Sequence, residues 1–299
     1  MRTIPLNTER YKTPQESKVL DQAKKELDKY EKNTMLLPLI DDGYFQVGSL
    51  GGGNHFIELQ EDEKGLLCIM IHSGSRHLGK AVCDYFHEEA RKLNRLWYSE
   101  VKDEYRLAFL PVSSVEGQQY IHWMNLAMDY AFENRACMLK KVCSIVKEQI
   151  EKNTDRIVEF GEEINCHHNY AALENHYDAN VWVHRKGATR VRQGELAVIP
   201  GAMGSYSYVV EGKGNKESFC TSSHGAGRNY SRTGAMQAFS VEKVMVDLKE
   251  QDIVLGKRKK NDVPEECRFA YKDIDQVMAQ QSDLVTPIRK LKTVGVVKG

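Results

Sequence analysis

Residues 117–152 read GQQYIHWMNLAMDYAFENRACMLKKVCSIVKEQIEK. Apolar residues recur at every third or fourth position of this stretch, and after Gly117 it contains neither Gly nor Pro. This spacing predicts one long α-helix with an apolar face. From about residue 155 the pattern changes to short β-rich runs between polar loops, namely NVWVHRKG (180–187), LAVIPG (196–201) and SYSYVVEG (205–212).

The segments around this helix predict further helices and strands. We expect an amphipathic helix over 14–32 with Pro14 in its first turn, a glycine-dense turn at 48–59 that runs into a short strand, and a buried strand at 66–72. Further helices are expected over 80–97, near 238–251 and over 273–285. Because helices and strands mix without regular βαβ alternation, we expect an α+β fold: a single domain over residues 1–299, with mixed β strands, flanking helices and one long helix.

The composition limits the class of protein. The 42 Lys and Arg residues balance 42 Asp and Glu residues, which argues against a broadly basic nucleic-acid-binding coat but leaves room for a local basic groove. No stretch approaches the ~20 apolar residues that cross a bilayer, and the first residues lack a signal-peptide core, so we expect no membrane partner and no export. Seven scattered cysteines without a CxxC pair match neither a disulfide framework nor a structural zinc site, and they favour a cytoplasmic location.

One short motif suggests a phosphate-binding loop. Gly74–Lys80 matches the G-x4-G-K part of that loop, between an expected strand and an expected helix. The next residue is Ala81, however, where the motif needs a Ser or Thr hydroxyl for magnesium. A P-loop nucleotidase is therefore only an alternative hypothesis for this chain.

Several histidines lie in polar, glycine-rich contexts at expected strand ends. His55 lies in Gly-Asn-His-Phe, His72 ends an apolar run, and His167-His168-Asn169 ends the run EEINCHHN. Neutral imidazoles that converge from separate segments are typical of an open transition-metal site. Satisfied polar residues at strand ends give the same pattern, so both interpretations stay open.

The segment Ser222–Arg228 reads SSHGAGR. A histidine between small residues, His224, leaves room for a phosphate to approach its ring, glycine N–H groups can bind an anion, and Arg228 can neutralise charge. A nucleophilic histidine needs these features, although an exposed histidine in a glycine-rich turn also fits. Basic side chains either follow a polynucleotide backbone or form solvated faces, and they are Arg185, Lys186, Arg190, Arg192 and Lys257–Lys260.

Long motifs of this chain resemble those of the RtcB family of RNA-splicing ligases. They are, in the family's order, GGGNHFIEL, HSGSR, EINCHHNY, HRKGA, IPGAMGS, SFCTSSHGAGR, AYKDIDQVMAQQSDLV and the terminal VVKG. The resemblance covers roughly residue 45 to the C-terminus, and residues 1–44 match weakly. Motifs this long and this numerous are far more specific than a short phosphate-loop pattern.

The resemblance implies an RtcB-like α+β fold and an enzyme that joins RNA ends with GTP and Mn²⁺, of which the family binds two ions. The RNA substrates would carry a 3′-phosphate or 2′,3′-cyclic phosphate on one end and a 5′-hydroxyl on the other. The role would be tRNA splicing or RNA repair, and archease is a candidate activating partner.

The resemblance also implies roles for individual residues. His224 is similar to the histidine that becomes guanylylated by attack on the α-phosphate of GTP, and His55, His72 and His168 are similar to metal ligands. Glu58 would read the N1–H and N2–H edge of guanine. The positions that match guanylate-binding residues are Asn54, His55, Phe56, Ile57, Glu58, His168, Asn169, Pro200, Gly201, Ala202, Met203, Ser207, Gly225, Ala226, Gly227, Tyr271 and Lys298.

Two departures from the family pattern affect the expected activity. Ala202 stands where the family has a serine, so one polar contact to the nucleotide is lost. The family also has an upstream Asp-x-Gly-Cys-Gly motif that supplies the remaining manganese ligands, and residues 1–54 contain no cysteine. We therefore expect a truncated product or partial chain that shows little or no guanylylation when assayed alone. A non-catalytic remnant that binds GMP or RNA is the alternative.

Overall fold

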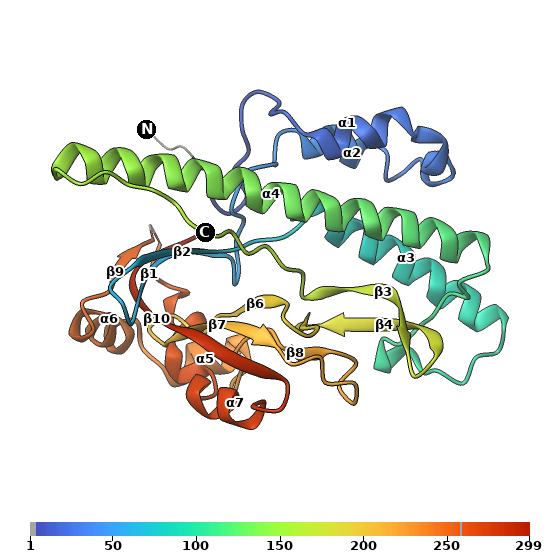
Figure 1. The fold of residues 1–299 in the computed structure, drawn as a ribbon. Coiled ribbons are helices and arrows are strands. Elements are labelled where there is room, and N and C mark those ends of the chain that lie inside the picture. Colours follow the sequence, from blue (N-terminus) through green and yellow to red (C-terminus); the bar gives the residue numbers. More distant parts are fainter. Residues whose placement is uncertain (1–3, 258) are drawn as a thin grey trace. The chain divides into compact units, whose positions relative to one another are not determined.

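The computed structural model describes residues 4–257 and 259–299 of the chain (Figure 1). The chain divides into two compact units, and each is described by itself. Unit 1 comprises the described residues up to Gly51 together with Ser73–Met138, and unit 2 comprises Gly52–His72 and Leu139–Gly299. The boundary after Met138 falls inside α4 (Val115–Asn153), the helix that was expected over 117–152.

Unit 1 is helical. Besides the first part of α4, its elements are α1 (Lys18–Lys25), the 3₁₀ turns η1 (Leu27–Lys29) and η2 (Glu31–Asn33), α2 (Pro38–Gly43), α3 (Arg76–Leu96) and η3 (Asp103–Tyr105). Apolar side chains recur every fourth residue of α3, at Leu78, Val82 and Phe86, and these three are buried. They share a core with Trp123 and Tyr130 of α4. The spacing of apolar residues therefore fixes which faces of these helices are buried.

The helix expected over 14–32 is shorter than its apolar pattern indicates. Ser17 caps α1, because its hydroxyl accepts a hydrogen bond from the backbone N–H of Leu20. The helix ends at Lys25, and η1 and η2 follow it. Pro14 therefore precedes the helix and does not occupy its first turn.

Unit 2 is built on a six-stranded sheet in which β10, red in Figure 1, lies between β1 and β7. The order is β2–β1–β10–β7–β6, and β9 pairs with β10. The strands are β1 (Phe56–Asp62), β2 (Leu67–His72), β6 (Leu196–Ile199), β7 (Ser207–Gly212), β9 (Val254–Gly256) and β10 (Val285–Lys298). All pairs are antiparallel except β9–β10.

Two small sheets and several short helices complete unit 2. The sheets pair β3 (Asn169–His176) with β4 (Ala179–Lys186), and β5 (Ala188–Arg190) with β8 (Thr221–Ser223). The helices are α5 (Arg232–Ala238), α6 (Val241–Glu250), α7 (Ile274–Gln280), and the 3₁₀ turns η4 (Val263–Glu266) and η5 (Arg268–Ala270). One apolar cluster packs α6 against the sheet through Val244, Leu248 and Val296.

The α+β class is confirmed, and most expected elements occur. The short strands β5, β8 and β9 were not expected, and the structure differs further at three longer strands. β3 and the 14-residue β10 were not expected. In β10, charged residues and Pro287 interrupt the apolar alternation, and the strand accommodates Pro287 with an irregular register. β2 was expected to be buried, but it is an edge strand with an exposed Leu67. Among the described residues no helix is long and apolar enough to span a membrane.

Candidate active site

Four histidines from four strand ends lie next to one another in unit 2. His55 directly precedes β1, His72 ends β2, His168 directly precedes β3 and His224 directly follows β8. Because Phe56 pairs with His72 in the β1–β2 ladder, His55 comes beside His72, with ring centroids 5.9 Å apart. The centroids of His72 and His168 are 4.9 Å apart, and those of His168 and His224 are 4.6 Å apart in a stack with 11° between the rings. The fold thus gathers the four imidazoles that the sequence indicated.

Gly187, the turn residue between β4 and β5, joins two of these histidines. Its carbonyl accepts a hydrogen bond from the backbone N–H of His224 at 3.4 Å, and its own N–H donates to Oδ1 of Asn169, the neighbour of His168, at 2.9 Å. Its φ is +64°, and a Cβ at this position would lie 3.3 Å from Nδ1 and Cε1 of the His224 ring. Glycine is therefore required both by the backbone conformation and by the close approach of His224.

The surroundings favour neutral imidazoles. Burial lowers the pKa of His72 well below its usual range, and the neighbouring rings of His168, His55 and His224 lower it further. Burial also lowers the pKa of His224, while a hydrogen bond between its imidazole and the backbone of Gly187 opposes this shift. At neutral pH these two rings therefore keep a lone pair that can bind a metal ion or attack an electrophile.

The donor set fits a transition metal only in part. Neutral imidazoles are suitable ligands, but in the described parts of the chain no group of three or more His, Cys, Asp or Glu side chains is arranged to hold a metal ion. Manganese also prefers carboxylate oxygen to nitrogen. A manganese ion at His55, His72 and His168 would therefore need further ligands in addition to these rings.

A buried carboxylate lies on β1 close to the C-terminal end of β10. Glu58 is 4% exposed, and its Oε2 accepts hydrogen bonds from Nε2 of Gln60 at 2.7 Å and from Oγ1 of Thr293 at 3.2 Å. Burial raises the pKa of Glu58 to about 7, although the charge of Lys298 acts in the opposite direction. Lys298 pairs with Phe56 in the β1–β10 ladder and is itself buried. The site therefore combines a buried acceptor with a buried cation.

The turn after β6 connects to this carboxylate through Ser207. Its Oγ accepts from the backbone N–H of Gly201 at 3.1 Å and from Nε2 of Gln60 at 3.0 Å. A Cβ on Gly225 would lie 3.1 Å from the carbonyl oxygen of Pro200, so the loop after His224 passes directly beside this turn. The expected guanylate-binding positions at both segments are thus neighbours in space.

The remaining expected positions differ in how closely they belong to the site. Asn54 is exposed directly before His55. Ile57 alternates to the face of β1 opposite Glu58, so it offers the site only its backbone. Ala202 and Met203 are buried in the turn after β6, and Met203 forms a β-bridge with Cys267. Ala226 is buried against an apolar cluster of unit 2, whereas Gly227, with φ +75°, is exposed.

Arg228 makes several contacts with the protein. Its Nη1 donates to the Tyr271 hydroxyl at 2.8 Å and to Oε1 of Glu266 at 3.2 Å, and its Nη2 donates to the carbonyl of Glu265 at 2.6 Å. Its guanidinium also lies 4.7 Å from the centroid of the Tyr271 ring. The charge expected to neutralise phosphate is thus engaged with a carboxylate.

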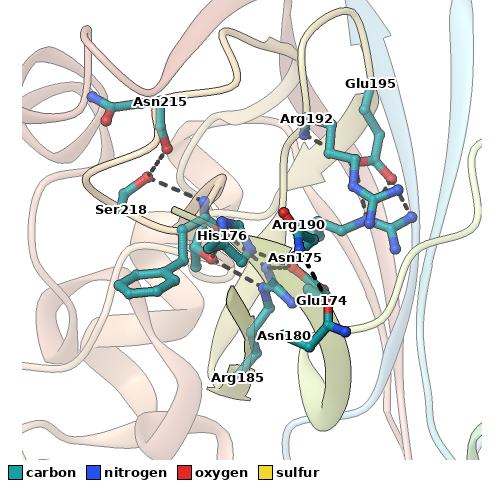
Figure 2. Close-up of polar contacts among 12 residues, drawn as sticks. Glu174, Asn175, His176, Asn180, Arg185, Arg190, Arg192, Glu195, Asn215 and Ser218 are labelled. Atoms are coloured by element: carbon teal, nitrogen blue, oxygen red, sulfur yellow. Dashed lines mark hydrogen bonds and ion pairs between the residues drawn. The ribbon is translucent and has the colours of Figure 1, made fainter. Parts of the chain in front are cut away.

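The idea that Arg185 follows an RNA backbone is wrong. Arg185 is 2% exposed, and its guanidinium forms a bidentate ion pair with Glu174, at 2.6 and 3.0 Å, across the β3–β4 ladder (Figure 2). Arg190 pairs with Glu195 at 2.7 Å and remains partly exposed. Arg258, one of the expected basic residues, lies outside the described residues.

The phosphate-loop interpretation of Gly74–Lys80 is also wrong. α3 already begins at Arg76, so Gly79 and Lys80 belong to a helix and do not form a loop around a phosphate. Lys80 forms an ion pair with Asp84 one helical turn further on.

Three residues of the site were not singled out by the sequence. Gly187 lies within the HRKGA motif, and only the structure reveals its contact with His224. Gln60 lies two residues after Glu58, so both side chains point to the same face of β1. This spacing of two polar residues could have indicated that Gln60 belongs to the site. Glu266 precedes the AYKD segment without any pattern that marks it.

Comparison with known proteins identifies the same family from the whole sequence. The family model described as tRNA-splicing ligase RtcB matches residues 6–299, which include most of the segment expected to match weakly. The chain is 41% identical over 259 residues to the RNA-splicing ligase RtcB of Escherichia coli strain K12, covering 86% of this chain and 62% of that protein.

Two further relatives give the same result. The RNA-splicing ligase RtcB of Mycobacterium tuberculosis is 32% identical over 291 residues, covering 86% of this chain and 66% of that protein. The tRNA-splicing ligase RtcB of Methanococcus maripaludis is 34% identical over 295 residues, covering 86% and 60%. The chain thus spans less than two thirds of the length of these relatives. On the family match and these identities, the chain belongs to the RtcB family.

Proposed function

We propose that this chain carries the guanylate-accepting site of an RNA ligase. In this proposal GTP and manganese are used to join an RNA 3′-phosphate or 2′,3′-cyclic phosphate end to a 5′-hydroxyl end, in tRNA splicing or repair. The observation that carries the proposal is the stack of His224 on His168, in contact with His72, beside a glycine turn that leaves the His224 ring uncrowded. The names of the relatives support the substrate class.

His224 is the nucleophile in this proposal. Because burial lowers the pKa of its ring, the imidazole is neutral and has a lone pair to attack the α-phosphorus of GTP. A P–N bond forms, and the bond from that phosphorus to the pyrophosphate oxygen breaks, so pyrophosphate leaves. The guanylyl group then passes to the RNA 3′-phosphate, and the 5′-hydroxyl displaces GMP. A bound manganese ion would supply positive charge near the phosphates, and His55, His72 and His168 would hold it.

Base recognition follows from the neighbouring carboxylate and ammonium group. Guanine presents two donors, N1–H and N2–H, next to the acceptor O6. The ionised carboxylate of Glu58 can accept from the two donors, and the ammonium group of Lys298 can donate to O6. Adenine presents an acceptor and a donor in the reverse arrangement, so this pair would favour GTP over ATP.

A second candidate function is non-catalytic binding of GMP or RNA. It is favoured by the finding that, within the described ranges, no three potential ligand side chains are arranged to hold a metal ion. Covalent labelling separates the two candidates. The ligase and a GMP-binding remnant both expect selective GMP binding, but only the ligase expects the label to become attached to the protein.

The test incubates the chain with α-³²P-labelled GTP over a series of Mn²⁺ concentrations, because an incomplete ligand set raises the concentration required. The ligase proposal expects a label that is stable in alkali and lost in acid, as a phosphoramidate is, and that is absent from His224→Ala. His184→Ala, at an exposed histidine of the same unit, is the matched control and should be labelled like wild type. GMP binding without label supports a GMP-binding remnant, and absence of both label and GMP binding contradicts the ligase and the GMP-binding remnant alike.

A further inference from the structure

Glu266 connects three segments of unit 2 that lie far apart in the sequence. It ends η4 and is 8% exposed. Its Oε1 accepts from Nη1 of Arg228 at 3.2 Å, and its Oε2 accepts from the hydroxyl of Tyr271 at 2.5 Å and lies 3.5 Å from Nζ of Lys298. Two of these partners, Tyr271 and Lys298, are expected guanylate-binding positions. Arg228 belongs to the loop that follows His224.

The carboxylate of Glu266 bonds to several side chains at once. A carboxylate has about four lone-pair sites, and here three different side chains occupy them. Burial lowers the pKa of Lys298, and the charges of Glu266 and then Glu58 oppose that shift, so the ammonium group is paired with Glu266 and also feels the charge of Glu58. Of these two carboxylates, only Glu58 would remain to attract the buried ammonium group if Glu266 lost its charge.

We propose that Glu266 is a positioning residue for guanine recognition: it holds Lys298 and Tyr271 in place and keeps Lys298 from neutralising Glu58. The inference rests on the proposed function. Removing the charge of Glu266 lets the Lys298 ammonium group move towards Glu58, which takes away the acceptors for N1–H and N2–H. Glu266 therefore acts on the base through Lys298 and Glu58 without touching it.

The test measures equilibrium binding of GMP and AMP to the full chain and to Glu266→Gln, which keeps the shape of the side chain but removes its charge. We expect the Kd for GMP to rise roughly tenfold, the loss of about one charge-assisted hydrogen bond, while the Kd for AMP changes little. Selectivity for guanine therefore falls, a result that a merely structural role of Glu266 would not produce. Glu266→Asp should recover part of the selectivity.

The matched control is Glu265→Gln. Glu265 is adjacent, and Arg228 uses only its backbone carbonyl. The Glu265 carboxylate lies 3.9 Å from Nε of Arg232, a partly exposed side chain that also lies 4.0 Å from Oε1 of Glu266. This variant should bind GMP like wild type. If Glu266→Gln melts early, Tyr271→Phe removes one contact of the same carboxylate and should weaken GMP binding more than AMP binding.

The outcomes separate the two proposals. If wild type binds GMP no better than AMP, the proposed function fails. If wild type is selective, Glu58→Gln loses selectivity and folded Glu266→Gln keeps it, only the role of Glu266 is overturned. Equal loss for GMP and AMP in folded Glu266→Gln also overturns it.

Discussion

The ring of His224 stacks on the ring of His168 with centroids 4.6 Å apart. Gly187 supports both residues, because its carbonyl accepts a hydrogen bond from the backbone N–H of His224 and its N–H donates to Asn169, the residue next to His168. The stack therefore depends on a turn between two small sheets and not on the main sheet of unit 2. It holds the proposed nucleophilic ring of His224 in contact with the expected metal-binding ring of His168. Substitutions at this turn should therefore disturb the arrangement of the two rings more than they destabilise unit 2.

Gly187→Ala should disrupt the site more than it destabilises unit 2. The new Cβ would lie 3.3 Å from the His224 ring, so the ring has to move. The positive φ adds strain of roughly 1–2 kcal/mol, which a denaturant titration measures. We expect the ¹H chemical shifts of His224 and His168 to change in NMR spectra, and GMP binding to weaken.

Gly194→Ala is the control for backbone strain. Gly194 has φ +75°, and no heavy atom lies within 4 Å of the position that a Cβ would take. This variant should lose about as much stability as Gly187→Ala yet keep wild-type histidine shifts. Equal shifts in both variants would mean that strain, and not the approach to His224, controls the stack.

The histidine cluster should bind manganese weakly. Mn²⁺ is paramagnetic, so a titration broadens the NMR signals of the imidazoles that lie near the ion. We expect broadening at His55, His72 and His168 before His184, which is exposed on β4. His72→Ala should raise the Mn²⁺ concentration for half-broadening by roughly tenfold or more, as expected for loss of a ligand. Broadening that begins at His184 would place the ion elsewhere.

Local patterns predicted the secondary structure well where the apolar period was regular. The 3.6-residue period marked α4, and the short β-rich runs marked β4, β6 and β7. The period failed at β10, where Pro287 and alternating lysines conceal a strand that the sheet pairs on both sides. Pairing with distant strands, and not local propensity, makes this segment a strand.

The candidate site was predicted in its residues but not in its connections. His55, His72, His168 and His224 were found because glycine, asparagine and serine surround them, an unusual context for imidazole. The contact of Glu266 with Lys298 and Arg228 could not be found, since it depends on how η4 packs against β10. Likewise, the charge of Arg185 suggested RNA, and only burial on β4 reveals its ion pair.

The ion pair between Arg185 and Glu174 should be essential for stability. Both side chains are nearly inaccessible to solvent and bond in two places, so removing one partner leaves a buried charge (Figure 2). Arg185→Met should lower the free energy of unfolding by roughly 3–5 kcal/mol in a urea titration. Arg190→Met, which breaks the more exposed pair with Glu195, should cost about 1 kcal/mol or less. Similar losses in the two variants would contradict the buried pair as the reason.

The buried carboxyl of Glu58 should make stability depend on pH. Its pKa in the folded chain is raised to about 7 from the usual 4.5, so the folded state binds this proton more tightly than the unfolded state does. The stabilisation is therefore complete below pH 4.5 and is lost as pH rises towards 7, by on the order of 3 kcal/mol. His72, whose pKa is lowered, gives the opposite slope as pH rises through its unfolded value of 6.5.

The measurement is therefore a difference: the free energy of unfolding of wild type minus that of Glu58→Gln, taken by urea titration from pH 4.5 to 7.5. We expect this difference to fall steadily as pH rises, because the variant cannot titrate at this position while His72 contributes equally to both. A flat difference would mean that Glu58 stays ionised throughout, held by Lys298, and that the carboxylate is already charged when a nucleotide arrives.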